Sequence, residues 1–88
     1  MHGKDVRLRI TGSPTLTEVE LGNLTIWFSY QTPVAYFQAG CGLVVSENVW
    51  SRTTGKHLGM VEATMHADKR NRISHDVFLG RLAAVTAS

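Results

Sequence analysis

The sequence predicts a single small α+β domain in which a short antiparallel sheet is packed by a C-terminal helix. Two observations carry this prediction. The first half of the chain holds four or five short β-rich runs separated by close turns, which is typical of an antiparallel meander rather than of βαβ units. The end of the chain has helical apolar spacing. With 88 residues, of which 43% are apolar and 18% charged, the chain suits one globular core spanning residues 1–88.

The strands are predicted from alternation of apolar and polar side chains, since neighbouring residues of a strand point to opposite faces of a sheet. The firmest of them are two runs joined by Gly22-Asn23, a pair suited to the primed turn of a two-residue hairpin. Pro33 is placed at the start or edge of a strand, where its missing N–H is tolerated. The predicted strands span residues 4–11, 16–21, 24–30, 34–39 and 43–46.

Alternation also assigns side chains to the two faces of the sheet. Ile26 and Phe28 share the face expected to lie against the last helix, whereas Trp27 and Phe37 point to the opposite face. Two alternatives follow for this second face. Either Trp27 and Phe37 are exposed and form an aromatic patch for a partner, or the segment 50–65 folds over them and buries them.

The segment after Asn48 predicts a short helix capped by Thr53 or Thr54. Leu58, Val61 and Met65 would then share one face, at spacings of i, i+3 and i+7. The alternative is a hairpin that bends at Gly55, since the two glycines of this segment disfavour a helix.

A final helix is predicted after a polar loop at residues 68–72. Ser74 is a suitable N-cap, and Ile73 and Phe78 stand at the positions of a hydrophobic staple. Phe78, Leu82 and Val85 recur at helical spacing and give the stripe expected to lie on the sheet.

The sequence contains no catalytic or metal-binding signature. Its four histidines include no pair at i, i+4 spacing, and the single cysteine cannot supply a Cys-x-x-Cys half-site, so neither a metal nor a cofactor is expected. Residues 53–57 fail the Walker A pattern, although their hydroxyls and Lys56 would suit an isolated phosphate. We expect no enzyme; if there is activity, it should depend on His57 or Cys41.

The charged residues permit binding of nucleic acid without requiring it. The formal net charge is +2, which produces only a weak electrostatic field around the protein. Arg7 and Arg9 share a strand face with Glu18 and Glu20, which would oppose them if the strands pair. The residues that would contact phosphates in this alternative are Arg52, Lys56, Lys69, Arg70 and Arg72.

The expected location is the cytoplasm. A single cysteine removes any dependence on an oxidising compartment, and no apolar run approaches the roughly 18 residues that a membrane span needs. The start of the chain has no apolar signal core.

Residues 21–58 resemble a family of small uncharacterised proteins encoded by bacteriophages and related mobile elements. The most specific part of the resemblance is the core Trp-Ser-x-Thr-Thr-x-x-His-Leu at residues 50–58. Membership implies a phage setting inside a bacterial host and no particular activity. Compact proteins of such origin often bind and occupy a host or phage component without catalysis.

The function expected from these observations is stoichiometric binding to a host or phage protein, such as a component of host defence or replication. A homo-oligomer is compatible with the size of the chain, and a nucleic-acid-binding accessory protein is the alternative. The residues expected to bind the protein partner are Trp27, Phe37, Trp50, Thr53, Thr54, Lys56 and His57.

Overall fold

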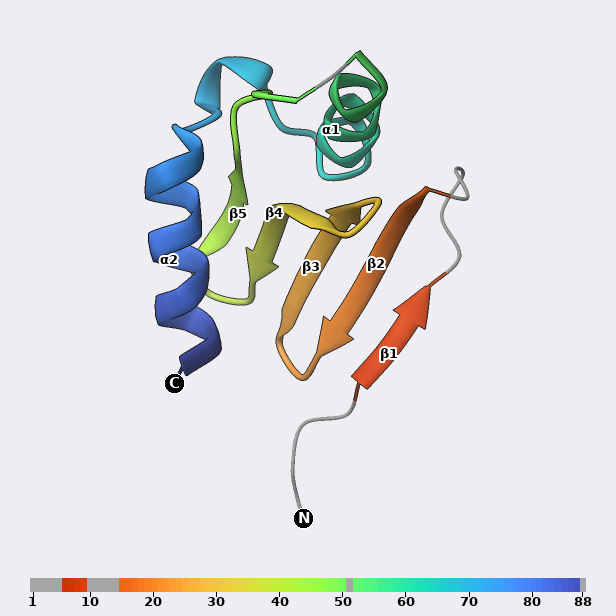
Figure 1. Cartoon of the computed structure of the whole chain (residues 1–88). Helices are drawn as coiled ribbons and strands as arrows, with labels where there is room; N and C mark the ends of the chain where they lie inside the picture. Colours follow the sequence, from red (N-terminus) through yellow and green to blue (C-terminus); the bar gives the residue numbers. More distant parts are fainter. Residues whose placement is uncertain (1–5, 10–14, 51, 88) are drawn as a thin grey trace.

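The computed structural model describes residues 6–9, 15–50 and 52–87, and it has a five-stranded antiparallel sheet with one helix on each face (Figure 1). The strands follow one another in chain order across the sheet, so the α+β meander with a C-terminal helix is confirmed. The elements are β1 (Val6–Arg9), β2 (Leu16–Leu21), β3 (Leu24–Ser29), β4 (Thr32–Gln38), β5 (Gly42–Val45), α1 (Arg52–Thr64), the 3₁₀ turn η1 (Lys69–Asn71) and α2 (His75–Ala87).

Two-residue turns join β2 to β3 and β3 to β4. Leu21 pairs with Leu24 around the first turn, and Gly22 has a φ of 62° while Asn23 is not left-handed, which is the φ pattern of a type II′ turn. The second turn, between Ser29 and Thr32, has Tyr30 at a φ of 58°. Pro33 lies inside β4 rather than before it, next to a register shift opposite Trp27 and Phe28.

The face of the sheet toward α2 is the one that alternation predicts. Leu24, Ile26 and Tyr36 form a buried cluster with Phe78, and Phe28 packs against its edge. Leu82 and Val85 continue the contact along α2, so the predicted stripe of the last helix is confirmed. Burial of this stripe is the main force that holds α2 on the sheet.

The opposite face is covered by α1, whose Leu58 and Val61 pack over Trp27. Trp27 is only 4% exposed, and Phe37 is partly buried against the same cluster. Of the two alternatives for this face, the buried one is therefore correct, and no aromatic patch forms around Trp27. The apolar side of α1 has to be removed from water, and this sheet face supplies the matching surface.

The middle segment is a helix, and the hairpin alternative is wrong. The helix begins at Arg52, so Thr53 and Thr54 lie within its first turn and the predicted cap at these residues is wrong. Gly55 lies within α1 beside the side chain of Asn48: a Cβ at Gly55 would stand 2.9 Å from Asn48 Nδ2. Asn48 Oδ1 in turn accepts a hydrogen bond from the backbone N–H of Trp50 at 3.1 Å. The glycine thus makes room for a side chain that fixes the approach to α1.

The segment between the helices is tied to the edge of β5. Ser46 forms a parallel bridge with Ile73, and the backbone N–H of Ile73 donates to the carbonyl of Val45. Ser74 then begins α2, with its Oγ accepting from the N–H of Val77 at 3.4 Å. Ile73 and Phe78 pack in the same cluster, which confirms the predicted staple.

Candidate functional site

Four polar side chains from β3, α1 and the start of β2 form a hydrogen-bonded chain beneath α1. Ser29 Oγ lies 2.6 Å from His57 Nδ1 and 3.0 Å from Thr54 Oγ1. His57 Nε2 lies 3.0 Å from Thr15 Oγ1. We call Thr15, Ser29, Thr54 and His57 the Ser29–His57 cluster. Thr54 and His57 reach Ser29 together because residues at i and i+3 share one face of a helix.

The buried surroundings of His57 favour the neutral form of its imidazole. Burial lowers the pKa of His57 below its ordinary value, because a charged ring would lose its hydration. A neutral imidazole has one donor and one acceptor nitrogen, and the hydroxyls of Ser29 and Thr15 can each serve either role. Both ring nitrogens of His57 therefore have a hydroxyl partner within the cluster.

A serine hydroxyl at hydrogen-bond distance from a histidine is also the geometry of an activated nucleophile. Here, however, Ser29 and His57 are each only 2% exposed, so in this structure no substrate can contact them. Cys41 is exposed, but it lies in the β4–β5 turn, at the other end of β4 from Ser29. The structure thus does not bring His57 and Cys41 together. The Ser29–His57 cluster instead lies where α1 docks onto the sheet.

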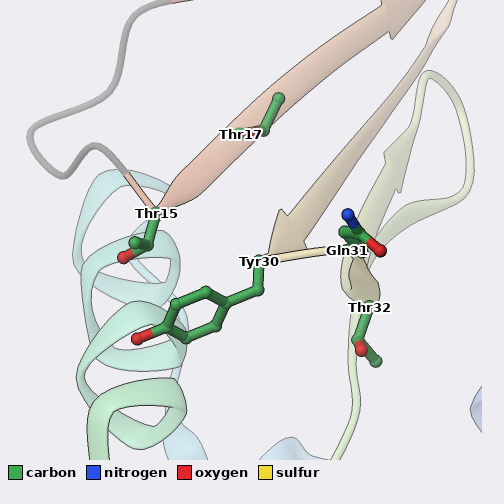
Figure 2. A pocket seen from close by; sticks show the side chains of 5 residues that line it. All are labelled: Thr15, Thr17, Tyr30, Gln31 and Thr32. Atoms are coloured by element: carbon green, nitrogen blue, oxygen red, sulfur yellow. The ribbon is translucent and has the colours of Figure 1, made fainter.

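A pocket with a volume of about 450 Å³ opens beside this cluster, where β2 begins and β3 turns into β4 (Figure 2). It is lined by Thr15, Thr17, Tyr30, Gln31 and Thr32. The N–H of Tyr30 donates to the carbonyl of Thr15 at 2.7 Å, and the Tyr30 ring centroid lies 5.9 Å from that of His57. Sequence reasoning missed this pocket. The available signal was a two-residue turn, Tyr30-Gln31, that has no glycine.

The residues predicted to bind a partner do not form one surface. Trp50, Thr53 and Lys56 are exposed, and Phe37 is partly covered. Trp27, Thr54 and His57 are buried, which removes them from any contact surface of the folded domain. The physical reason is the helical period of α1, which turns residues 54, 57 and 58 toward the sheet and residues 53 and 56 toward solvent.

Two arginines of the basic run are engaged within the chain. Arg72 donates two hydrogen bonds to Glu62, with Nη2–Oε1 and Nε–Oε2 distances of 2.6 and 2.8 Å, and this pair is largely buried. Arg70 donates from Nε and Nη2 to a single oxygen of Asp68, Oδ2, and this pair is exposed. Glu62 raises the pKa of Arg72 and Asp68 raises the pKa of Arg70, in both cases through these side-chain hydrogen bonds. Lys69, Arg52 and Lys56 are exposed.

A second surface feature lies where the chain passes the start of α2. The Trp50 ring meets the His75 ring edge-on, with centroids 4.6 Å apart, and His75 Nδ1 lies 3.1 Å from Ser46 Oγ. Leu79 lies one helical turn beyond His75, on the same side of α2. We call Trp50 and Leu79 the outer surface of α2, while Val77 lies on the other flank of the helix. Among the described residues, the large exposed apolar side chains are Tyr30, Val49, Trp50, Val77 and Leu79.

In the described ranges no three histidine, cysteine or acidic side chains gather as a metal site. Nor does any described helix have the length and apolar character to cross a membrane.

A family model described as a family of unknown function matches residues 5–78. The chain belongs to this family, DUF8033. The matched part of the DUF8033 domain contains the whole Ser29–His57 cluster and every lining residue of the pocket, and it ends at Phe78 in α2. No curated protein and no solved structure matches the chain.

Proposed function

We propose that this DUF8033 domain is a non-enzymatic accessory protein of phage type that acts by stoichiometric binding to a protein partner. The partner is a host or phage protein, and inhibition of host defence or replication is the expected consequence. The observation that carries the proposal is the exposed apolar side of α2. The phage setting is supported by the resemblance of residues 21–58 and awaits its own test.

The composition of α2 is unusual for a helix at a surface. Its 13 residues include two charged side chains, Asp76 and Arg81. Phe78 is its one buried residue, yet Val77 and Leu79 on other sides remain 48% and 41% exposed. A helix that packs on a sheet with one face normally carries polar residues on the opposite face. Exposed apolar side chains such as Leu79 are what contact with another protein requires.

Trp50 extends this apolar surface beyond the helix. Its side chain is 36% exposed and is held in place by the edge-on contact with His75. A tryptophan that is already fixed loses little freedom on binding, and tryptophan is enriched among the residues that dominate binding energy. Of the residues predicted from sequence to contact a partner, Trp50 is the one that belongs to the outer surface of α2.

In this structure, two of the five basic residues expected to contact nucleic acid are already paired within the chain. Arg70 and Arg72 are each paired with a carboxylate, so binding a phosphate would first require breaking these pairs. Lys69, Arg52 and Lys56 remain as exposed cations. Nucleic-acid binding would weaken steeply as salt rises, because it releases counterions, whereas binding through an apolar surface would not.

The experiment compares the wild-type domain with Trp50→Ser and Leu79→Ser as baits in a host lysate, with Lys56→Ser as the matched control. A protein retained by the wild type and by Lys56→Ser is purified and titrated against each variant by calorimetry. We expect one partner per domain and about tenfold or greater weakening by each outer-surface variant. Equal binding by all variants, or recovery of nucleic acid alone, would reject the proposal.

A further inference from the structure

We infer that the pocket beside Tyr30 binds a neutral, hydroxyl-rich ring, that is, a saccharide or the sugar of a nucleoside. The site is separate from the outer surface of α2, and nothing in the proposed protein binding requires it. Three properties lead to this inference: the lining chemistry, the backbone at Tyr30, and the support that the Ser29–His57 cluster gives to one wall. Figure 2 shows the five lining side chains around the turn.

The lining residues are all uncharged, and each carries a polar group beside apolar atoms. Three threonines and Gln31 supply hydroxyl and amide groups that can donate or accept hydrogen bonds, and Tyr30 adds a phenol. The Tyr30 side chain is 56% exposed, so the ring is accessible to a ligand. Sugars present alternating hydroxyls and apolar C–H faces, which match these polar groups and an aromatic ring. Because the five described lining residues carry no positive charge, an anionic ligand such as phosphate is disfavoured.

The backbone at Tyr30 gives an independent indication. Both two-residue turns of the sheet place their first residue in the left-handed region, with φ values of 62° and 58°. The first turn uses Gly22, the residue that takes this conformation without strain. The second uses Tyr30, whose bulky side chain makes the same conformation costly. Strained residues of this kind cluster at ligand sites, and here the strain presents an aromatic ring at the mouth of a pocket.

One wall of the pocket is fixed from behind. Thr15 is hydrogen-bonded through its side chain to His57 Nε2 at 3.0 Å, and its carbonyl accepts from the N–H of Tyr30 at 2.7 Å. These contacts join the start of β2 to the turn and to α1, so the two sides of the pocket hold their spacing in the free protein. A binding site that is already ordered spends less interaction energy on ordering itself.

The test is titration of the ¹⁵N-labelled wild-type domain with glucose, galactose, N-acetylglucosamine, ribose, adenosine, uridine and inorganic phosphate, each followed by amide chemical shifts. We expect saturable shifts at Tyr30, Gln31 and Thr15, with a dissociation constant near the millimolar range. Binding of free sugars identifies a saccharide site. Binding of adenosine and uridine, but of none of the free sugars, identifies the sugar of a nucleoside, because ribose is the part that the two nucleosides share.

Two variants keep the test independent of folding. Tyr30→Gly suits the left-handed backbone and should remain folded, yet it should weaken binding about tenfold because the ring is lost. Thr17→Val keeps the shape of a lining side chain and removes its hydroxyl, so it should weaken binding without disturbing the fold. Trp50→Ser should leave the shifts unchanged, which separates this site from the protein-binding proposal. Absence of saturable shifts with every probe, or equal shifts in Tyr30→Gly, or preferential binding of inorganic phosphate, would overturn the inference.

Discussion

The buried pair between Glu62 and Arg72 should dominate the stability of the segment that joins the helices. The side chains are 7% and 18% exposed, and two hydrogen bonds join them at 2.6 and 2.8 Å. Arg72→Met would leave the Glu62 carboxylate buried without its cation. Loss of one partner of a buried pair typically destabilises by 3–5 kcal/mol, and we expect about 3 kcal/mol because some solvent reaches Arg72. A domain of this size has a total stability on the order of 5–10 kcal/mol.

The measurement is urea unfolding, followed by far-UV circular dichroism and by the fluorescence of Trp27, which is buried and should report loss of the core. Arg70→Met is the matched control, because it removes the same chemical group from the exposed pair with Asp68, where side-chain exposures are 85% and 44%. The double variant Glu62→Leu/Arg72→Met should recover much of the loss. If Arg72→Met is no less stable than Arg70→Met, the carboxylate is not left uncompensated and the reasoning is refuted.

Three further predictions concern stability. Tyr30→Gly should be more stable than Tyr30→Ala by about 1 kcal/mol in urea unfolding, because only glycine relieves the left-handed backbone; equal values would contradict the strain. The folded-state pKa of His57 lies below its unfolded value, so stability should be full above pH of about 6.5 and fall as pH decreases, by up to about 1.4 kcal/mol per pH unit. His57→Gln should reduce this slope, and an unchanged slope would assign it to other groups. Gly59→Ala, with open space around its Cβ, should stabilise α1 by about 0.5–1 kcal/mol, whereas Gly55→Ala must displace Asn48 and should gain nothing; thermal unfolding of the two variants decides.

The parts of the fold that depend on local pattern could be predicted from the sequence. Alternation fixed the face of Ile26, and Gly22-Asn23 marked the first hairpin, because both signals lie within a few residues of the structure they specify. The start of α2 was equally local: Ser74, Ile73 and Phe78 occupy positions defined by the helix end itself. The register of β1 and β2 places Arg7 opposite Glu20, which is the strand pairing that the expected opposition of charges required.

The environment of Trp27 could not be predicted in the same way. Alternation places Trp27 on a face, but whether that face is covered depends on α1, which begins 25 positions later in the chain. The indole N–H also finds a partner that no periodicity specifies, Glu18 Oε1 at 2.8 Å on the neighbouring strand. With its polar atom satisfied, the ring can lie beneath Leu58 without an unpaired donor.

The candidate sites were still harder to predict, because their contacts are long-range. Ser29 and His57 are separated by 28 positions, and Thr15 and His57 by 42. Nothing near Ser29 distinguishes it from any other serine at a strand end. Tyr30 does carry a local signal, since a hairpin of two residues requires a positive φ, but turn chemistry alone would predict glycine rather than tyrosine there.

This arrangement changes what the segment Trp-Ser-x-Thr-Thr-x-x-His-Leu at residues 50–58 implies for this chain. Thr54, His57 and Leu58 lie on the side of α1 that meets the sheet, and two of them bond directly to Ser29. Their spacing is therefore that of a helix docking onto β3, with the first residue, Trp50, left at the surface. A motif that builds the fold cannot by itself name a partner. For this chain, we therefore expect binding to depend on Tyr30 and on the outer surface of α2 rather than on the buried residues of the segment.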